Sequence, residues 1–159
     1  FFEGLVHVPL LFMWRGKFVA DLTSDALVEL VDIAPTLLEA AGSDVPTTMQ
    51  GKSLLGILTG RVAPDHHKDV VVSEFNDALG SAKEHRPTHA TMSFDGHYKV
   101  IVYHDMNLGE IFDCETDPGE FENLWDSPDF ASRKSEFLIR HLDAVMATSS
   151  PGIARVGRF

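Results

Sequence analysis

The pattern of apolar and polar residues changes character near residue 69. Before that point, a continuous apolar run extends from Val6 to Trp14 and ends at Arg15-Gly16. Such a run favours a strand that is buried on both faces, with Pro9 tolerated near its start or at a sheet edge. A strand of this kind needs covering layers on both sides, and the residues that follow it supply just one short helix.

That helix is predicted over residues 32–41, where apolar residues recur at helical spacing. Asp32 is a suitable N-cap, and Pro35 falls in the first turn, where its missing N–H costs little. Residues 43–68 are rich in glycine and proline and predict mostly loop, with one helical turn over residues 53–58.

After residue 69 the apolar residues alternate with polar ones, which is the period of half-buried strands. The predicted strands are Val70–Val72, Thr88–Phe94, Tyr98–Tyr103 and Glu110–Asp113. The dipeptide Asp95-Gly96 joins two of them and is a strong hairpin signal. The second part of the chain therefore predicts a four-stranded, largely antiparallel sheet.

A helix is predicted to follow the sheet, because Ser127-Pro128 provides a cap and a first-turn residue. Its apolar positions form a stripe that could cover one face of the sheet: Phe130, Phe137, Leu138, Leu142, Val145 and Met146. Residues 149–159 show no periodicity and are interpreted as a tail. The chain as a whole is predicted to be of the α+β class.

Composition narrows the possible partners. The 159 residues, 44% apolar and 23% charged, are typical of one ordinary globular domain. The net charge of −11 argues against nucleic acid or an anionic membrane as a partner. A single cysteine excludes an internal disulfide. The sequence opens at Phe1 without an initiator methionine, and we expect it to be part of a longer protein.

Two possible metal sites are unconvincing. The acidic residues from Asp113 to Asp117 alternate as in a calcium loop, but Pro118 stands where glycine is needed and Leu124 where the closing glutamate belongs. We expect a turn there instead. His66 and His67 are adjacent, so in a strand they would point to opposite faces rather than toward one metal ion.

Nucleophilic catalysis has little support in the sequence. No G-x-S-x-G motif is present. The one thiol, Cys114, lies among carboxylates, which raise the pKa of a thiol and so suppress the reactive thiolate.

The strongest candidate site lies where one predicted strand ends and the next begins. The candidate residues are Asn76, His85, Arg86 and His89. Arginine offers a planar set of donors for sulfate, phosphate or carboxylate, and histidine adds donors whose charge depends on pH. The alternative interpretation, that these side chains solvate a long hairpin loop, is equally compatible with the sequence.

Five ordered motifs resemble the C-terminal portion of a sulfatase of the alkaline-phosphatase-like superfamily, over roughly residues 3–147. They are Glu3-Gly4 with His7-Val8-Pro9-Leu10 and Trp14-Arg15-Gly16; Asp32-Ile33-Ala34-Pro35-Thr36-Leu37-Leu38 with Ala41-Gly42; Gln50-Gly51-Lys52-Ser53-Leu54; Gly96-His97-Tyr98-Lys99; and Glu110-Ile111-Phe112-Asp113 with Asp117-Pro118-Gly119-Glu120 and Asn123-Leu124.

The resemblance implies an α/β parent fold. Residues 1–68 would form the edge of its large α/β domain, and residues 69–148 its small C-terminal subdomain, a four-stranded antiparallel sheet with a packed helix. Residues 149–159 would be a tail. Sulfatases hydrolyse sulfate esters with a formylglycine made from a C/S-x-P-S/A-R motif, which this chain lacks, and with calcium. We therefore expect no catalytic residue and no metal ligand in this chain, and no activity when it is isolated.

The same resemblance suggests that Asn76, His85, Arg86 and His89 line the mouth of the parent's active site and select the alcohol part of a sulfate ester. Two alternatives stay open at this point: a phosphonate or phosphate ester hydrolase of the same superfamily, and a non-catalytic binding or oligomerisation module. We also expect a homo-oligomer, because an unpaired apolar strand at Val6–Trp14 would be a template for association.

Overall fold

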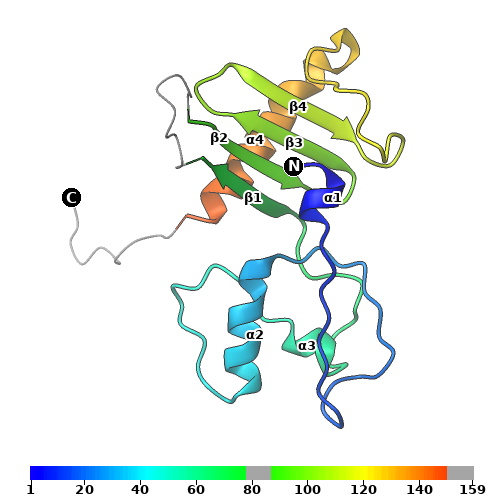
Figure 1. The fold of residues 1–159 in the computed structure, drawn as a ribbon, viewed down its shortest axis with the longest axis vertical. Helices are drawn as coiled ribbons and strands as arrows, with labels where there is room; N and C mark the ends of the chain where they lie inside the picture. The colour runs from blue at the N-terminus through cyan, green and yellow to red at the C-terminus, as the bar shows by residue number, and fades with distance from the viewer. Residues whose placement is uncertain (78–86, 150–159) are drawn as a thin grey trace, which may run out of the picture.

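The computed structural model describes residues 1–77 and 87–149. Figure 1 shows a sheet with helix α4 across one face in the upper part, and helices α2 and α3 in the lower part. The elements in chain order are α1 (Glu3–Val6), η1 (Leu30–Asp32), α2 (Ile33–Ala40), α3 (Leu55–Leu58), β1 (Val71–Asn76), β2 (His89–Phe94), β3 (Tyr98–Tyr103), β4 (Leu108–Asp113), η2 (Pro128–Phe130) and α4 (Ala131–Ala147).

The predicted four-stranded sheet is confirmed. Its order is β1-β2-β3-β4, and every neighbouring pair is antiparallel. The turn between β2 and β3 forms as the Asp95-Gly96 signal predicts. The carboxylate of Asp95 accepts hydrogen bonds from the amides of His97 and Tyr98 at 3.1 and 2.7 Å, and Gly96 adopts a φ of 92°.

Each face of the sheet carries its own apolar cluster, because successive side chains of a strand point to opposite faces. On one face, Met92, Ile101 and Phe112 are covered by Phe1 and Val6. On the other face, Val100 and Ile111 pack against Phe137 of α4. Helix α4 therefore covers a single face, and the N-terminal residues cover part of the opposite one.

The predicted stripe of α4 is partly wrong. The buried residues of this helix are Phe137, His141 and Ala144, whereas Leu142 and Met146 are 58% and 59% exposed. Hydrogen bonds of His141 explain why the buried face of the helix differs from the predicted one. Two buried hydroxyl groups of β2 bind the ring of His141, and burial of unpaired hydroxyls would cost free energy. This contact fixes which face of the helix meets the sheet.

The predicted strand at Val6–Trp14 does not form. Residues 3–6 make the single helical turn α1, and residues 7–14 belong to none of the strands in the described residues. Leu11 and Met13 are 87% and 83% exposed. A strand requires a neighbouring strand to pair its backbone amides and carbonyls. The described residues place none beside this segment.

The predicted helix over residues 32–41 is confirmed with slightly shorter bounds as α2, and the predicted turn over residues 53–58 is α3. Asp32, however, does not cap α2 through its side chain. Its carboxylate turns back and accepts the Glu29 amide at 2.9 Å. Within residues 1–77 and 87–149, no helix has the length and apolar character needed to span a membrane.

Candidate functional site

Two of the four candidate site residues lie side by side. Asn76 and His89 are paired across β1 and β2, at the end of the hairpin, and both are exposed. His85 and Arg86 lie outside the described residues. Because β1 and β2 are antiparallel, the predicted neighbourhood of Asn76 and His89 follows directly from the strand register.

A chain of side-chain contacts that begins at His89 was not predicted from the sequence. The ring of His104 lies 4.8 Å from that of His89. His104 Nε2 is 2.9 Å from Thr91 Oγ1, and Thr91 Oγ1 is 2.9 Å from His141 Nε2. His141 Nδ1 is in turn 2.8 Å from Ser93 Oγ. The alternation of residues 89, 91 and 93 on one strand face was the available signal, but the partners come from β3 and α4.

His141 is a buried neutral group. Burial, with a smaller contribution from the charge of His104, lowers the pKa of His141 to about 4. The residue also lines a cleft of about 380 Å³ between α4 and the sheet. The lining residues are Asp69, Val70, Ser93, Asp95, Tyr98, Val100, Phe137, Arg140, His141, Asp143, Ala144 and Ala147.

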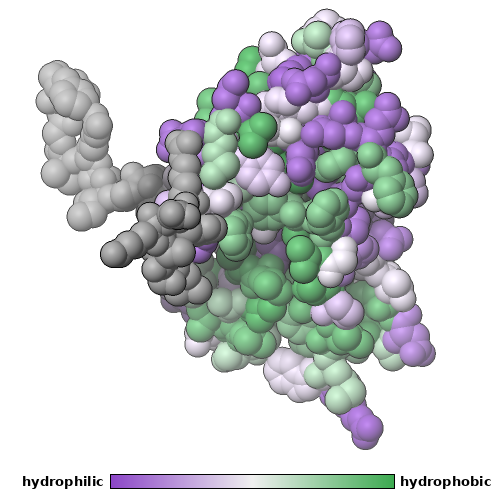
Figure 2. Space-filling model, turned by 45° about the horizontal axis from the view of Figure 1, so that its top comes forward, coloured by the Kyte–Doolittle hydropathy of each residue, from purple (hydrophilic) through white to green (hydrophobic). Residues whose placement is uncertain are grey.

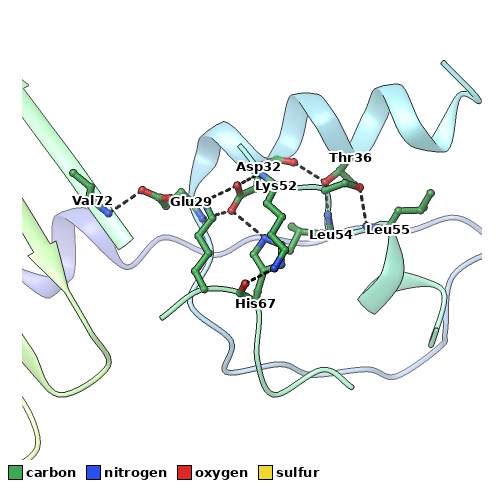
Figure 3. Close-up of polar contacts among 10 residues, drawn as sticks. Glu29, Asp32, Thr36, Lys52, Leu54, Leu55, His67 and Val72 are labelled. Carbon is green, nitrogen blue, oxygen red and sulfur yellow. Dashed lines mark hydrogen bonds and ion pairs between the residues drawn. The ribbon is translucent and has the colours of Figure 1, made fainter. Parts of the chain in front are cut away.

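A second polar cluster joins residues 1–68 to the sheet (Figure 3). The fully buried carboxylate of Asp32 accepts the amides of Glu29 and Lys52 at 2.9 and 2.7 Å and pairs with Lys68 Nζ at 2.7 Å. His67 Nε2 lies 3.4 Å from Asp32 without a hydrogen bond. Burial lowers the pKa of His67, against the attraction of Asp32. We call these five residues the Asp32 cluster.

Further contacts extend the Asp32 cluster in both directions. Glu29 accepts the Val72 amide at 2.8 Å and so reaches strand β1. Thr36 donates to the Asp32 carbonyl at 2.6 Å and accepts the Leu54 amide at 2.8 Å (Figure 3). Through these bonds, side chains hold together backbone segments that are distant in the sequence. The Asp32 carboxylate itself is occupied by the amides of Glu29 and Lys52 and by Lys68, which makes it unsuited to act as a catalytic base.

A third cluster attaches α1 to the sheet. Lys99 is fully buried, pairs with Glu3 at 2.6 Å and with Glu120, and donates to the Phe1 carbonyl at 3.2 Å. Glu120 also accepts the Glu3 amide at 3.0 Å. Burial alone would lower the pKa of Lys99, but its bonds to Glu120 and Glu3 raise it above the usual value. We call this group the Lys99 cluster.

Comparison with known proteins decides the family. Residues 1–147 match the family described as N-sulphoglucosamine sulphohydrolase, C-terminal. The chain belongs to this sulfatase family. It is 35% identical over 130 residues to arylsulfatase K of Rattus norvegicus, and the alignment covers 77% of this chain and 22% of that protein. It is 30% identical over 141 residues to the N-acetylglucosamine-6-O-sulfatase of Bacteroides thetaiotaomicron, with coverage of 86% and 24%.

Solved structures agree with the family. A 2-O GAG sulfatase superposes with a TM-score of 0.61 at 31% identity, covering 74% of this chain and 24% of that one. The phosphonate monoester hydrolase of Silicibacter pomeroyi gives a TM-score of 0.65 at 21% identity, covering 81% and 27%, which shows a shared fold. The chain thus spans about a quarter of the length of the relatives that it matches.

The sulfatase motifs of this chain converge on the two ionic clusters. Glu3, Lys99 and Glu120 come from three separate motifs and meet in the Lys99 cluster. Asp32 and Lys52 come from two others and meet in the Asp32 cluster. These sulfatase motifs therefore act here as joints between segments that are distant in the sequence.

The described residues do not fit the calcium or the formylglycine that sulfatases imply. Residues 1–77 and 87–149 contain no cluster of three His, Cys, Asp or Glu side chains that could hold a metal ion. Burial is the largest cause that raises the pKa of the Cys114 thiol, and nearby carboxylates raise it further against the charge of Lys99. The acidic run forms the expected turn, in which the Glu120 amide donates to the Asp117 carbonyl at 3.0 Å.

Proposed function

We propose that this chain is the C-terminal part of a sulfuric ester hydrolase, to which it contributes scaffold and substrate-binding residues. The family match over residues 1–147 carries the proposal. In this arrangement residues 1–68 belong to the edge of a large α/β domain, residues 69–148 form the small C-terminal subdomain, and residues 149–159 are a tail. Calcium and formylglycine would be supplied by the rest of the parent.

The apolar surface of residues 1–68 supports the scaffold role. Figure 2 shows apolar side chains gathered over the lower part of the molecule, where these residues lie. The exposed large apolar side chains of residues 1–68 include Leu5, Val8, Leu11, Met13, Trp14, Leu30, Val31 and Leu37. Many exposed large apolar side chains in one part of a chain are typical of an interface. We propose that the remainder of the sulfatase packs against it; pairing of two copies of the chain is the competing arrangement.

The rim role rests on the end of the β1–β2 hairpin. Asn76 and His89 present an amide and an imidazole at one exposed position. With His85 and Arg86 they would bind the alcohol part of a sulfate ester, as a set of donors that suits a polar or anionic sugar. Sulfated sugars are the first substrates to test, because relatives of this chain include an N-acetylglucosamine-6-O-sulfatase.

The reaction class is tested by assaying the complete protein from its full reading frame on an aryl sulfate, a sulfated glucosamine and a phosphonate monoester. We expect sulfate ester hydrolysis to exceed phosphonate hydrolysis by at least tenfold, and we expect the 159-residue chain alone to release no sulfate. Faster phosphonate hydrolysis would favour the alternative hydrolase. Inactivity of the complete protein on all three would favour a binding module.

The rim is tested separately in the complete protein. Arg86→Ala and His89→Ala should each lower kcat/KM on the preferred substrate at least tenfold. His66→Ala, at an exposed histidine that precedes β1, is the matched control and should have no effect. If both rim variants match the unmodified protein, these residues solvate the hairpin loop instead.

A further inference from the structure

His89 presents its imidazole at the exposed end of the β1–β2 hairpin. Its backbone is held on both sides, because it pairs with Asn76 and its carbonyl accepts the His104 amide at 2.8 Å. Strand pairing fixes the Cα of His89 but leaves the side-chain torsions of its ring free. A free ring must be immobilised when a ligand binds, which lowers affinity. An imidazole that binds a ligand at this position therefore gains affinity from any side chain that holds it.

His104 supplies such a support from the neighbouring strand. It directly follows β3, and the bond from its amide to the His89 carbonyl places the two residues opposite each other. Side chains that are opposite each other on antiparallel strands lie on the same face of the sheet. The two ring centroids are 4.8 Å apart, with the ring planes inclined at 44°. The ring of His104 therefore limits the orientations that are open to the ring of His89.

The ring of His104 is itself anchored to buried groups. Its Nε2 is 2.9 Å from Oγ1 of Thr91, a residue that is 2% exposed. The same oxygen is 2.9 Å from Nε2 of His141, and one hydroxyl can bond to both rings because it has one hydrogen and two lone pairs. Ser93 in turn binds Nδ1 of His141 at 2.8 Å. His104 thus connects the exposed ring of His89 to buried polar contacts between β2 and α4.

Asn76, the other rim residue that the structure describes, has no comparable support. Within residues 1–77 and 87–149, no hydrogen bond or ion pair holds its side-chain amide. Strand β2 lies between Asn76 on β1 and His104 after β3. Residues that are well separated and share no contact contribute independently to binding and stability. A change at His104 should therefore act on His89 and leave Asn76 unaffected.

We propose that His104 is a positioning residue: its ring, anchored by Thr91, holds the imidazole of His89 in the orientation that binds the alcohol part of the substrate. The support requires no change of protonation and no particular direction of the two bonds of Thr91. The ring contact is independent of the proposed function, whereas its effect on substrate binding rests on the proposed rim role of His89. Buried contacts between β2 and α4 would in this way set the orientation of a group at the surface.

Nuclear magnetic resonance of the complete protein without substrate tests the ring contact. Relaxation of ¹³C in labelled histidine rings reports ring motion on the picosecond-to-nanosecond timescale, and His89→Gln assigns the signal of His89. We expect restricted motion of this ring in the unmodified protein and greater motion in His104→Ala. His66→Ala, at an exposed histidine that precedes β1, is the matched control and should leave the motion of His89 unchanged.

Further variants separate the ring of His104 from its anchor. His104→Phe keeps a ring beside His89 and should retain most of the restriction. His104→Gln removes the ring and should release His89, which keeps the test available if His104→Ala does not fold. Thr91→Val keeps the shape and removes the hydroxyl, so His104 loses its anchor and His89 should gain motion. A His89 ring that is equally mobile in the unmodified protein and in the variants without the His104 ring overturns the proposal.

Kinetics of the complete protein test the effect on substrate binding. His104→Ala should raise KM for the preferred sulfate ester about fivefold and leave kcat within about twofold, because a rim group binds ground state and transition state alike. In a His89→Ala background the same change should have no further effect. In an Asn76→Ala background, which is the matched control, the rise in KM should persist.

The kinetic outcomes distinguish the positioning role from the proposed function. A rise in KM that persists without His89 would mean that His104 acts on its own, and it overturns the positioning role. The role is also overturned if His89→Ala lowers kcat/KM while His104→Ala leaves it unchanged. If His89→Ala leaves the kinetics unchanged while His104→Ala still frees the ring, the rim role of His89 fails and the ring contact stands.

Discussion

The two parts of the molecule are stabilised in different ways. In residues 1–68 the buried large aliphatic side chains are Leu54 and Ile57, and the most deeply buried groups include Asp32 and Thr36. The sheet and α4 instead enclose an apolar cluster on each face. The first part is thus fixed by side chains that bind backbone, and the second by packing. Burial therefore does not follow apolar content in the first part, where many apolar side chains face outward.

The largest expected effect is at the centre of the polar part. Asp32→Ala removes the acceptor for two amides and the partner of Lys68, and should lower the stability of residues 1–68 by about 4 kcal/mol. Hydrogen exchange at the Glu29 and Lys52 amides measures it. The exposed Asp65→Ala is the control, and equal exchange in the two variants would contradict the role given to Asp32.

The next largest effect is expected in the Lys99 cluster, which attaches α1 to the sheet. Lys99→Met leaves the buried carboxylate of Glu120 without its partner and should cost about 3 kcal/mol in urea denaturation. Changing Glu120→Gln as well removes the uncompensated charge, so we expect the double variant to regain at least half of the loss. Lys17→Met, at an exposed position, should be neutral. A double variant less stable than Lys99→Met would show that the charge is not the cause.

Acid should weaken the packed part through His141. Because burial holds the folded-state pKa of His141 at about 4, below its ordinary value of 6.5, the unfolded chain binds the proton more readily between these values. Stability contributed by the neutral ring is present above pH 6.5 and is lost as the pH falls toward 4, by up to about 3 kcal/mol. His141→Gln should flatten this loss in denaturation series, whereas the exposed His66→Gln should not.

The smallest effect compares two apolar positions of the packed part. Ile111→Val removes one methyl group from a fully buried side chain and should cost about 1 kcal/mol. Leu142→Ala, on the outer face of α4, should stay within about 0.5 kcal/mol. Thermal unfolding of both variants measures the difference. A larger cost at Leu142 would restore the helix stripe that its sequence spacing predicts.

Local signals predicted most of the sheet. Alternation and the Asp95-Gly96 turn fix strands whose partners are adjacent in the sequence, so the antiparallel hairpins followed from them, whereas the predicted strand Val70–Val72 stopped short of the Asn76 position that pairs with His89. The face of α4 could not be predicted, because His141 is placed by hydroxyls about 50 residues earlier. The apolar run at Val6–Trp14 predicted burial, but a sequence pattern does not supply the strand that must pair with it.

The Lys99 cluster could not be predicted from the sequence for a similar reason. Lysine in a strand ordinarily indicates a solvent-facing position. Lys99 is buried because Glu3 and Glu120, 96 and 21 residues away, converge on it. In the candidate site, His104 and Thr91 were missed because their contacts depend on the pairing of β2 with β3 and on the position of α4, which no single segment encodes.

Gly51 shows how closely the polar part is fitted together. A methyl group at this position would overlap the carbonyl of Val31, directly before the amide of Asp32. The loop that carries Lys52 can therefore approach η1 only where a side chain is missing altogether. In a library of all twenty amino acids at position 51, the variants that still fold should almost all carry glycine. A library at Gly4, whose surroundings are open, should yield folded variants with many different residues.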